Sequence, residues 1–263
     1  MGRSGGGCAP PSIPDLPEVP DGVDIVPAPY GDVVAEMVSV AHLLAEELKV
    51  PEPKAYIVPH EYRGRYSYRQ EQRTPDTPNL ARIQLGYRVP GSAWSIVVDR
   101  SGSINTMLKP LQQGLMAIHL ALEELALSHR IAALEGNALL KDFGDTSPVP
   151  RALIAGLQGA TTSQVMPTLC PMFEALMARP EEIKVLLLLH DGLAHDPDPL
   201  ASWAREARCL PGFFFWGIYL GSNPQEEAAM KGLLGADRLI ACWPAELPLK
   251  FGNVLWAFRP VGV

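Results

Sequence analysis

Short apolar runs alternate with amphipathic helical patterns along the chain from residue 93 onward. A run such as VLLLL has no polar side, so other elements must cover both of its faces. The apolar runs stand at 93–98, 185–189, 213–220 and 238–242, and the helical patterns at 108–125, 169–176, 199–208 and 225–234. This alternation is typical of an α/β fold with a mainly parallel central sheet and helices on both faces, in a Rossmann-like arrangement.

The longest helical pattern has a single apolar stripe. The residues of the stripe are three and four positions apart, as one buried helix face requires. They are Leu108, Leu111, Leu115, Ile118, Leu122 and Leu125. Pro110 lies in the first turn, where a missing N–H is tolerated. His119 lies off the stripe, so we expect it to be exposed.

The length of 263 residues predicts one or two domains. We divide the chain into a flexible Pro/Gly-rich leader at 1–29, an extension at 30–90 and an α/β domain at 91–263. Within the extension, residues 32–48 carry apolar side chains at helical spacing, and 54–90 indicate short strands or a hairpin. The domain is therefore preceded by a helix and a short β-hairpin-like segment.

The stretch 54–90 of the extension is rich in arginine and locally basic, although the whole chain carries a net charge of −7. Its arginines are Arg63, Arg65, Arg69, Arg73, Arg82 and Arg88. We expect this segment to dock on an acidic surface, with Arg65 and Arg69 as candidate partner-binding residues. The tyrosines between the arginines could instead stack on nucleic-acid bases, but the acidic chain makes a nucleic-acid partner the weaker alternative.

Four cysteines are widely spaced and form no CxxC pair, which favours a reducing compartment. The first residues contain no apolar segment of the kind that secretory signals have, and no apolar run approaches the ~20 residues that span a bilayer. We therefore expect a cytoplasmic protein that does not associate with membranes.

Polar residues with oxygen atoms follow the predicted strands. Asp99, Ser101 and Ser103 leave the first strand at alternate positions, and Asp191 follows the central strand. In open α/β sheets ligands bind outside the carboxyl ends of the strands, so these side chains should converge there. Thr161 or Thr162, in the loop between them, could add a hydroxyl. Hard oxygen donors of this kind suit Mg2+ that keeps some of its waters.

Two histidines flank Asp191. We interpret His190 and His195 as residues that shape the loop or lie at the surface, rather than as transition-metal ligands. The sequence has no HExxH, Walker A or GxGxxG pattern, and no G-x-S-x-G elbow between a predicted strand and a predicted helix. It offers no convincing catalytic base near the strand ends. We therefore expect that the chain is not an enzyme.

Five segments of the α/β region resemble the von Willebrand factor A (VWA) domain, in that family's order. They are WSIVVDRSGSI, KDFGD, GATTSQ, LLLLHDG and WGIYLG, with His190 where the family usually has threonine. The resemblance covers residues 93–258. It implies a metal-ion-dependent adhesion site in which Mg2+, or alternatively Mn2+, is bound by Asp99, Ser101, Ser103, Thr161 and Asp191, with Thr162 as the alternative threonine. A carboxylate from an acidic partner protein would then complete the shell of the ion.

The C-terminal part also resembles VWA proteins that partner MoxR-type AAA+ ATPases, through HDGLAHDPDP and LLGADRLIACWPAELPLKFGNVL. That group includes the VWA subunit of cobaltochelatase, the nitric-oxide-reductase activation protein and the rubisco-activase adaptor. The resemblance implies an adaptor or substrate-recognition subunit of an AAA+ machine. Two alternatives remain open, namely a non-catalytic subunit of a metal-chelatase complex and an RNA-binding VWA protein.

Overall fold

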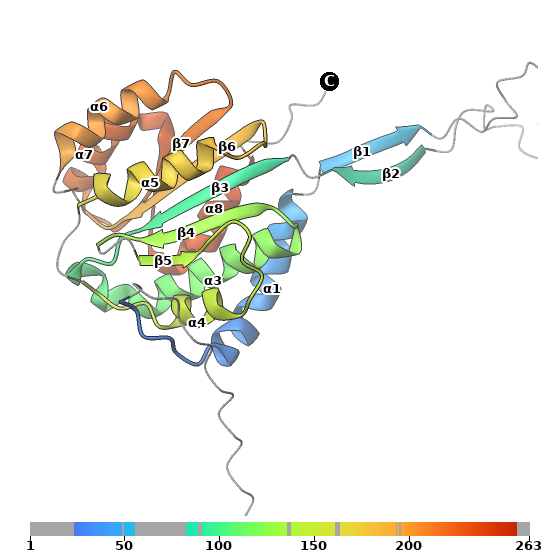
Figure 1. Cartoon of the computed structure of the whole chain (residues 1–263), viewed down its shortest axis with the longest axis horizontal. Helices are drawn as coiled ribbons and strands as arrows, with labels where there is room; N and C mark the ends of the chain where they lie inside the picture. Colours follow the sequence, from blue (N-terminus) through green and yellow to red (C-terminus); the bar gives the residue numbers. More distant parts are fainter. Residues whose placement is uncertain are drawn as a thin grey trace, which may run out of the picture.

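The computed structural model describes residues 24–48, 50–55, 83–88, 91–135, 138–160, 164–192, 194 and 196–256 (Figure 1). Six strands form its central sheet: β3 (Ser92–Val98), β4 (Ser128–Ala133), β5 (Ala138–Lys141), β6 (Ile183–His190), β7 (Phe213–Leu220) and β8 (Leu239–Cys242). They lie in the order β5-β4-β3-β6-β7-β8, and all neighbours are parallel except β5, which runs antiparallel to β4. Taken in chain order, this is the 3-2-1-4-5-6 order of doubly wound sheets. The expected α/β fold is confirmed.

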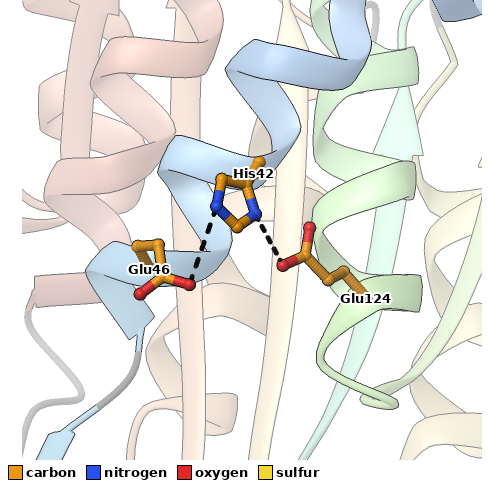
Figure 2. Close-up of side chains that lie close together, drawn as sticks. All are labelled: His42, Glu46 and Glu124. Carbon is orange, nitrogen blue, oxygen red and sulfur yellow. Dashed lines mark hydrogen bonds and ion pairs between the residues drawn. The ribbon is translucent and has the colours of Figure 1, made fainter.

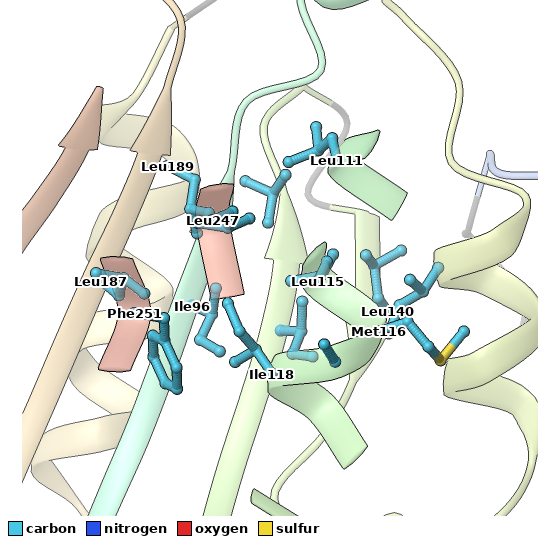
Figure 3. Packing of buried hydrophobic residues seen from close by; sticks show 14 of the residues in the cluster. Ile96, Leu111, Leu115, Met116, Ile118, Leu140, Leu187, Leu189, Leu247 and Phe251 are labelled. Atoms are coloured by element: carbon cyan, nitrogen blue, oxygen red, sulfur yellow. The ribbon is translucent and has the colours of Figure 1, made fainter. Parts of the chain in front are cut away.

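Helices cover both faces of the sheet (Figure 1). One face carries α1 (Gly31–Leu48), α3 (Leu108–Glu124), α4 (Val149–Ala155) and α8 (Leu247–Trp256). The other face carries α5 (Met166–Met177), α6 (Pro197–Ala207) and α7 (Pro224–Leu234). Each face has its own buried cluster, and the sheet separates the two because successive strand residues point to opposite sides. Figure 3 shows part of the first cluster, where Ile96 of β3 lies among residues of α3, β6 and α8.

Helix α3 is buried more deeply than its stripe predicts. Leu111, Leu115, Ile118 and Leu122 are fully buried, as expected. The expectation that His119 is exposed is wrong, because its exposed fraction is 0%. The reason is that its side chain faces β4, where Nδ1 of His119 lies 2.9 Å from Nε2 of the buried His129.

Helix α3 also contacts α8 closely. A Cβ atom at Gly114 would lie 2.8 Å from Cδ2 of Leu247, so only glycine leaves room for that leucine. Glycine within a helix costs about 1 kcal/mol relative to alanine. The close approach of the two helices explains why α3 carries one at this position.

The N-terminal extension contributes to the same fold. Helix α1 packs on α3 and α8, and strands β1 (Val50–Ala55) and β2 (Ile83–Arg88) pair antiparallel as a separate ribbon that projects from the rest (Figure 1). The helix and hairpin-like segment that we expected ahead of the sheet are confirmed. The ribbon precedes β3 in the chain, so it lies at the amino ends of the parallel strands, opposite to their carboxyl ends. Arg65 and Arg69 lie outside the described residues.

Within the described part of the chain, no helix combines the length and the apolar character that crossing a membrane requires.

Candidate metal centre

Two adjacent strands bring the two predicted aspartates to one place. Strands β3 and β6 are parallel neighbours with Val98 opposite Leu189, and the N–H of Asp99 donates to the Leu189 carbonyl at 2.8 Å. Asp99 and Asp191 therefore leave the sheet side by side. The chain continues from β3 to β4 on one side and from β6 to β7 on the other, so this is the switch point of the sheet, where ligands of open α/β sheets bind.

Four of the predicted ligand residues converge here. The hydroxyl of Ser101 donates to Oδ1 of Asp191 at 3.2 Å and lies 2.8 Å from the hydroxyl of Ser103. The backbone N–H of Ser101 donates to Oδ1 of Asp99 at 2.7 Å. These contacts hold Asp99, Ser101, Ser103 and Asp191 in one cluster of oxygen donors.

The predicted threonine lies outside the described residues, as do Thr162 and His195. The described chain nevertheless reaches the cluster, because the N–H of Ala160 donates to the carbonyl of Arg100. A Cβ atom at Gly159 would lie 2.2 Å from Oδ1 of Asn105, so glycine permits this approach. The segment that leads into Thr161 therefore runs against the loop at 99–103.

The cluster has a buried floor and an open rim. Asp99 and His190 are 0% and 1% exposed, whereas Ser103 is exposed and Asp191 is half-buried. Burial raises the pKa of Asp99 to about 6; His190 and the Ser101 N–H oppose the rise, and Asp191 adds to it. Oδ2 of Asp99 and Oδ2 of Asp191 are buried and accept no hydrogen bond from any described residue. Buried carboxylate oxygens without donors are costly unless they bind a cation, so this donor set fits a divalent ion.

His190 lies inside the cluster. Its Nδ1 accepts from the N–H of Gly192 at 3.1 Å, so it contacts the loop that follows β6. The same Nδ1 also lies 3.3 Å from Oδ2 of Asp99. One ring nitrogen of His190 and one oxygen of each aspartate all lie within 4.8 Å of one another. The sequence signal was its place as the last residue of a buried strand, directly before Asp191.

Arg100 anchors the loop and was missed by sequence reasoning. Its side chain is 4% exposed and donates to the carbonyls of Leu134 and Glu135, at 2.8 and 2.9 Å, and to Oδ2 of Asp24 at 2.6 Å. These bonds tie the loop to the turn after β4 and to the segment before α1. No pattern in the sequence distinguishes such an arginine from one on the surface.

A second cluster of metal-ligating residue types lies at the surface between α1 and α3. It consists of His42, Glu46 and Glu124, all exposed (Figure 2). Nδ1 of His42 lies 2.9 Å from Oε1 of Glu124, and Nε2 lies 3.9 Å from Oε1 of Glu46. Because the two carboxylates contact different ring nitrogens, we interpret the group as polar contacts between the helices rather than as a metal site.

Among known proteins, this chain is similar in fold to several solved structures. No protein-family model matches the sequence, and no curated protein matches it either. The PilB minor pilin from Streptococcus sanguinis has a TM-score of 0.50 and 13% identity, with 69% of this chain and 66% of that chain covered. The vWF domain of the pilus tip protein Mfa5 from Porphyromonas gingivalis has a TM-score of 0.49 and 11% identity, with 66% of this chain and 98% of that chain covered. A von Willebrand factor type A structure from Catenulispora acidiphila has a TM-score of 0.44 and 16% identity, with 65% of this chain and 43% of that chain covered.

Proposed function

We propose that this chain is a VWA-like protein-interaction module that depends on a divalent cation. The observation that carries the proposal is the meeting of Asp99 and Asp191 at the ends of β3 and β6, each with a buried carboxylate oxygen that lacks a donor among the described residues. The five sequence segments that resemble the VWA family support it independently.

The residues of this chain would bind the divalent ion and orient its ligands. Asp99 and Asp191 would bind the ion, and Ser101 and Ser103, which already contact each other, would add neutral hydroxyl groups. Thr161 would contribute from the segment beside Arg100. When bound, the ion supplies an electrophilic position that can accept a carboxylate from a partner protein. Because Ser103 is exposed, the rim is open to such a side chain.

The finer role that we propose is that of an adaptor or substrate-recognition subunit for a MoxR-type AAA+ ATPase in the cytoplasm, without catalytic activity of its own. It is supported by the resemblance of the C-terminal segment to that group of proteins. The basic segment with Arg65 and Arg69 would provide a second, electrostatic contact.

The test is retention of the partner with and without Mg2+. We expect the wild type to retain an ATPase subunit in Mg2+ and release it in EDTA, and Asp99→Ala and Asp191→Ala to retain none in either condition. Asp237→Ala is the matched control, because this aspartate is 80% exposed and precedes β8 at the opposite edge of the sheet. Equal retention by the wild type in EDTA and by Asp99→Ala would show that the ion does not mediate recognition.

A further inference from the structure

His190 brings an imidazole into a site whose other donors are oxygen atoms. We propose that His190 is a nitrogen ligand of the ion held by Asp99 and Asp191, and that the site therefore binds a transition-metal dication such as Mn2+ or Zn2+ in preference to Mg2+. The inference rests on the proposed function, since it concerns the same ion. It goes beyond that function because it assigns a ligand that the metal loop itself does not contain.

His190 makes one hydrogen bond that an ion would have to replace. The N–H of Gly192 donates at 3.1 Å to the single lone pair of Nδ1, so an ion bound at Nδ1 would take the place of this bond. Oδ2 of Asp99 lies 3.3 Å from this Nδ1 and accepts no hydrogen bond from a described residue. A ring nitrogen and a carboxylate oxygen without a donor therefore lie side by side at a place where both side chains are buried. A cation bound by both would compensate this carboxylate oxygen, and the half-buried Gly192 could donate to water instead.

The separation of these two atoms fits two ligands of one ion. Zinc binds histidine nitrogen and carboxylate oxygen at about 2.1 Å, which places two ligands of a tetrahedral ion about 3.4 Å apart. The observed distance between Nδ1 and Oδ2 is 3.3 Å. An N–H···O hydrogen bond would usually be shorter, at about 2.9 Å.

The kind of donor determines the preferred ion. Mg2+ takes oxygen ligands and keeps several waters, whereas imidazole suits transition metals. Nε2 of His190 is buried and has no hydrogen-bond partner among the described residues, so the bond from Gly192 to Nδ1 is the contact that competes with the ion. The two aspartates still offer oxygen atoms, so Mg2+ should bind, but more weakly.

The experiment compares Mn2+ and Mg2+ binding to the metal-stripped full chain, with pulsed paramagnetic resonance of bound Mn2+ to detect coupling to a histidine nitrogen. We expect coupling in the wild type. His190→Asn keeps a side-chain oxygen that can accept from the Gly192 N–H. It should lose the coupling and bind Mn2+ about tenfold or more weakly, with Mg2+ affinity changed less than about threefold. Asp99→Ala should also lose the coupling, which keeps the test valid if His190→Asn does not fold.

His42→Gln is the control variant, because it removes the exposed imidazole of the surface cluster shown in Figure 2. Coupling that disappears in His42→Gln, or that persists in His190→Asn, overturns the inference. A wild type that binds both ions without nitrogen coupling also overturns it but leaves the proposed function standing. A wild type that binds neither ion overturns both.

Discussion

The carboxylate of Asp99 combines two conditions that rarely occur together without a bound cation. It is fully buried, and a second carboxylate, that of Asp191, lies beside it. Only one of its oxygens accepts a hydrogen bond from a described residue, the N–H of Ser101. Such a side chain lowers the stability of the folded chain when no cation compensates it, which is the usual cost of a preorganised binding site.

Asp99→Asn should therefore stabilise the metal-free protein. The amide keeps the oxygen that accepts from Ser101, and its N–H can donate where the second carboxylate oxygen cannot. We expect a gain of at least about 1 kcal/mol in the free energy of unfolding in EDTA. Mg2+ or Mn2+ should raise the melting temperature of the wild type but not of the variant. Chemical unfolding in EDTA and melting curves with added ion measure the two effects; a variant less stable than the wild type in EDTA would contradict the prediction.

At this scale the sequence predicts which residues follow strand ends, but not which side chains face each other. Asp99, Ser101, Ser103 and Asp191 could be found because the carboxyl ends of neighbouring parallel strands meet at one edge. The contact between His190 and Asp99 joins two strands far apart in the sequence, so no local pattern indicates it. The burial of Arg100 likewise depends on partners elsewhere in the chain.

Among the elements, α3 and β4 contain a buried pair of histidines. Nδ1 of His119 lies 2.9 Å from Nε2 of His129, whose Nδ1 lies 2.9 Å from the carbonyl of Leu127. Burial is the main cause that lowers the pKa of each histidine to about 3. The charged groups that act on the pair are Glu123, Lys141, Asp145 and Arg151. Both rings are therefore neutral in the folded chain over the ordinary pH range.

The pair should make the protein sensitive to acid. Between pH 6.5 and about 3 the unfolded chain binds two protons that the folded chain does not. Stability should therefore fall as the pH falls below 6.5, with a limiting slope of about 2.7 kcal/mol per pH unit from the pair. His119→Gln should remove about half of this slope, because one histidine remains. The double variant with His129→Gln should remove nearly all of it. Urea unfolding at a series of pH values measures these slopes, and equal slopes in all three proteins would contradict the prediction.

Helices α8 and α4 show where prediction of elements failed. The residues Leu247, Phe251 and Val254 of α8 are buried and have helical spacing, so a signal existed. Pro248 and Gly252 hid it, because both usually interrupt a helix. Here Pro248 lies in the first turn, where it is tolerated, and Gly252 lies near Leu44 of α1. Helix α4 has only seven residues, which is too short to show a period. By contrast, β3, β6, β7 and α3 were predicted because their patterns are long and unbroken.

In the whole molecule, α1 belongs to the same core as the sheet although it precedes the ribbon. Ala41, Leu44 and Ala45 of α1 are buried, and Ala41 and Leu44 belong to the cluster that covers one face of the sheet. The ion pair between Asp24 and Arg100 adds a second link, between the segment before α1 and the loop at 99–103. Removal of the segment would thus affect both the core and the loop.

Two adjacent leucines of α1 test this coupling. Leu44 is 6% exposed and Leu43 is 66% exposed. We expect Leu44→Ala to lower the free energy of unfolding by about 2–3 kcal/mol, because it leaves a cavity against α8, and Leu43→Ala to change it by less than about 0.5 kcal/mol. Urea unfolding followed by tryptophan fluorescence should show one transition in each variant. A separate early transition in Leu44→Ala alone would mean that α1 unfolds independently of the sheet.

The candidate metal site at Asp99 and Asp191 and the β1–β2 ribbon lie at opposite ends of the strands, so the two proposed contacts can be separated. Because Ala55 pairs with Ile83, residues 56–82 can be replaced by an Asn-Gly turn that closes the two strands directly. This removes Arg65 and Arg69. Exposed charges act over about 8–10 Å at physiological salt, so the shortened chain should lose the salt-sensitive part of partner binding. It should keep the increase in melting temperature that the ion causes, since the cluster is untouched.

Retention of the partner across ionic strength and melting curves with added ion measure the two effects on one protein. Loss of the ion effect in the shortened chain would show that the two ends act as one site, and unchanged salt dependence would exclude the basic segment from docking.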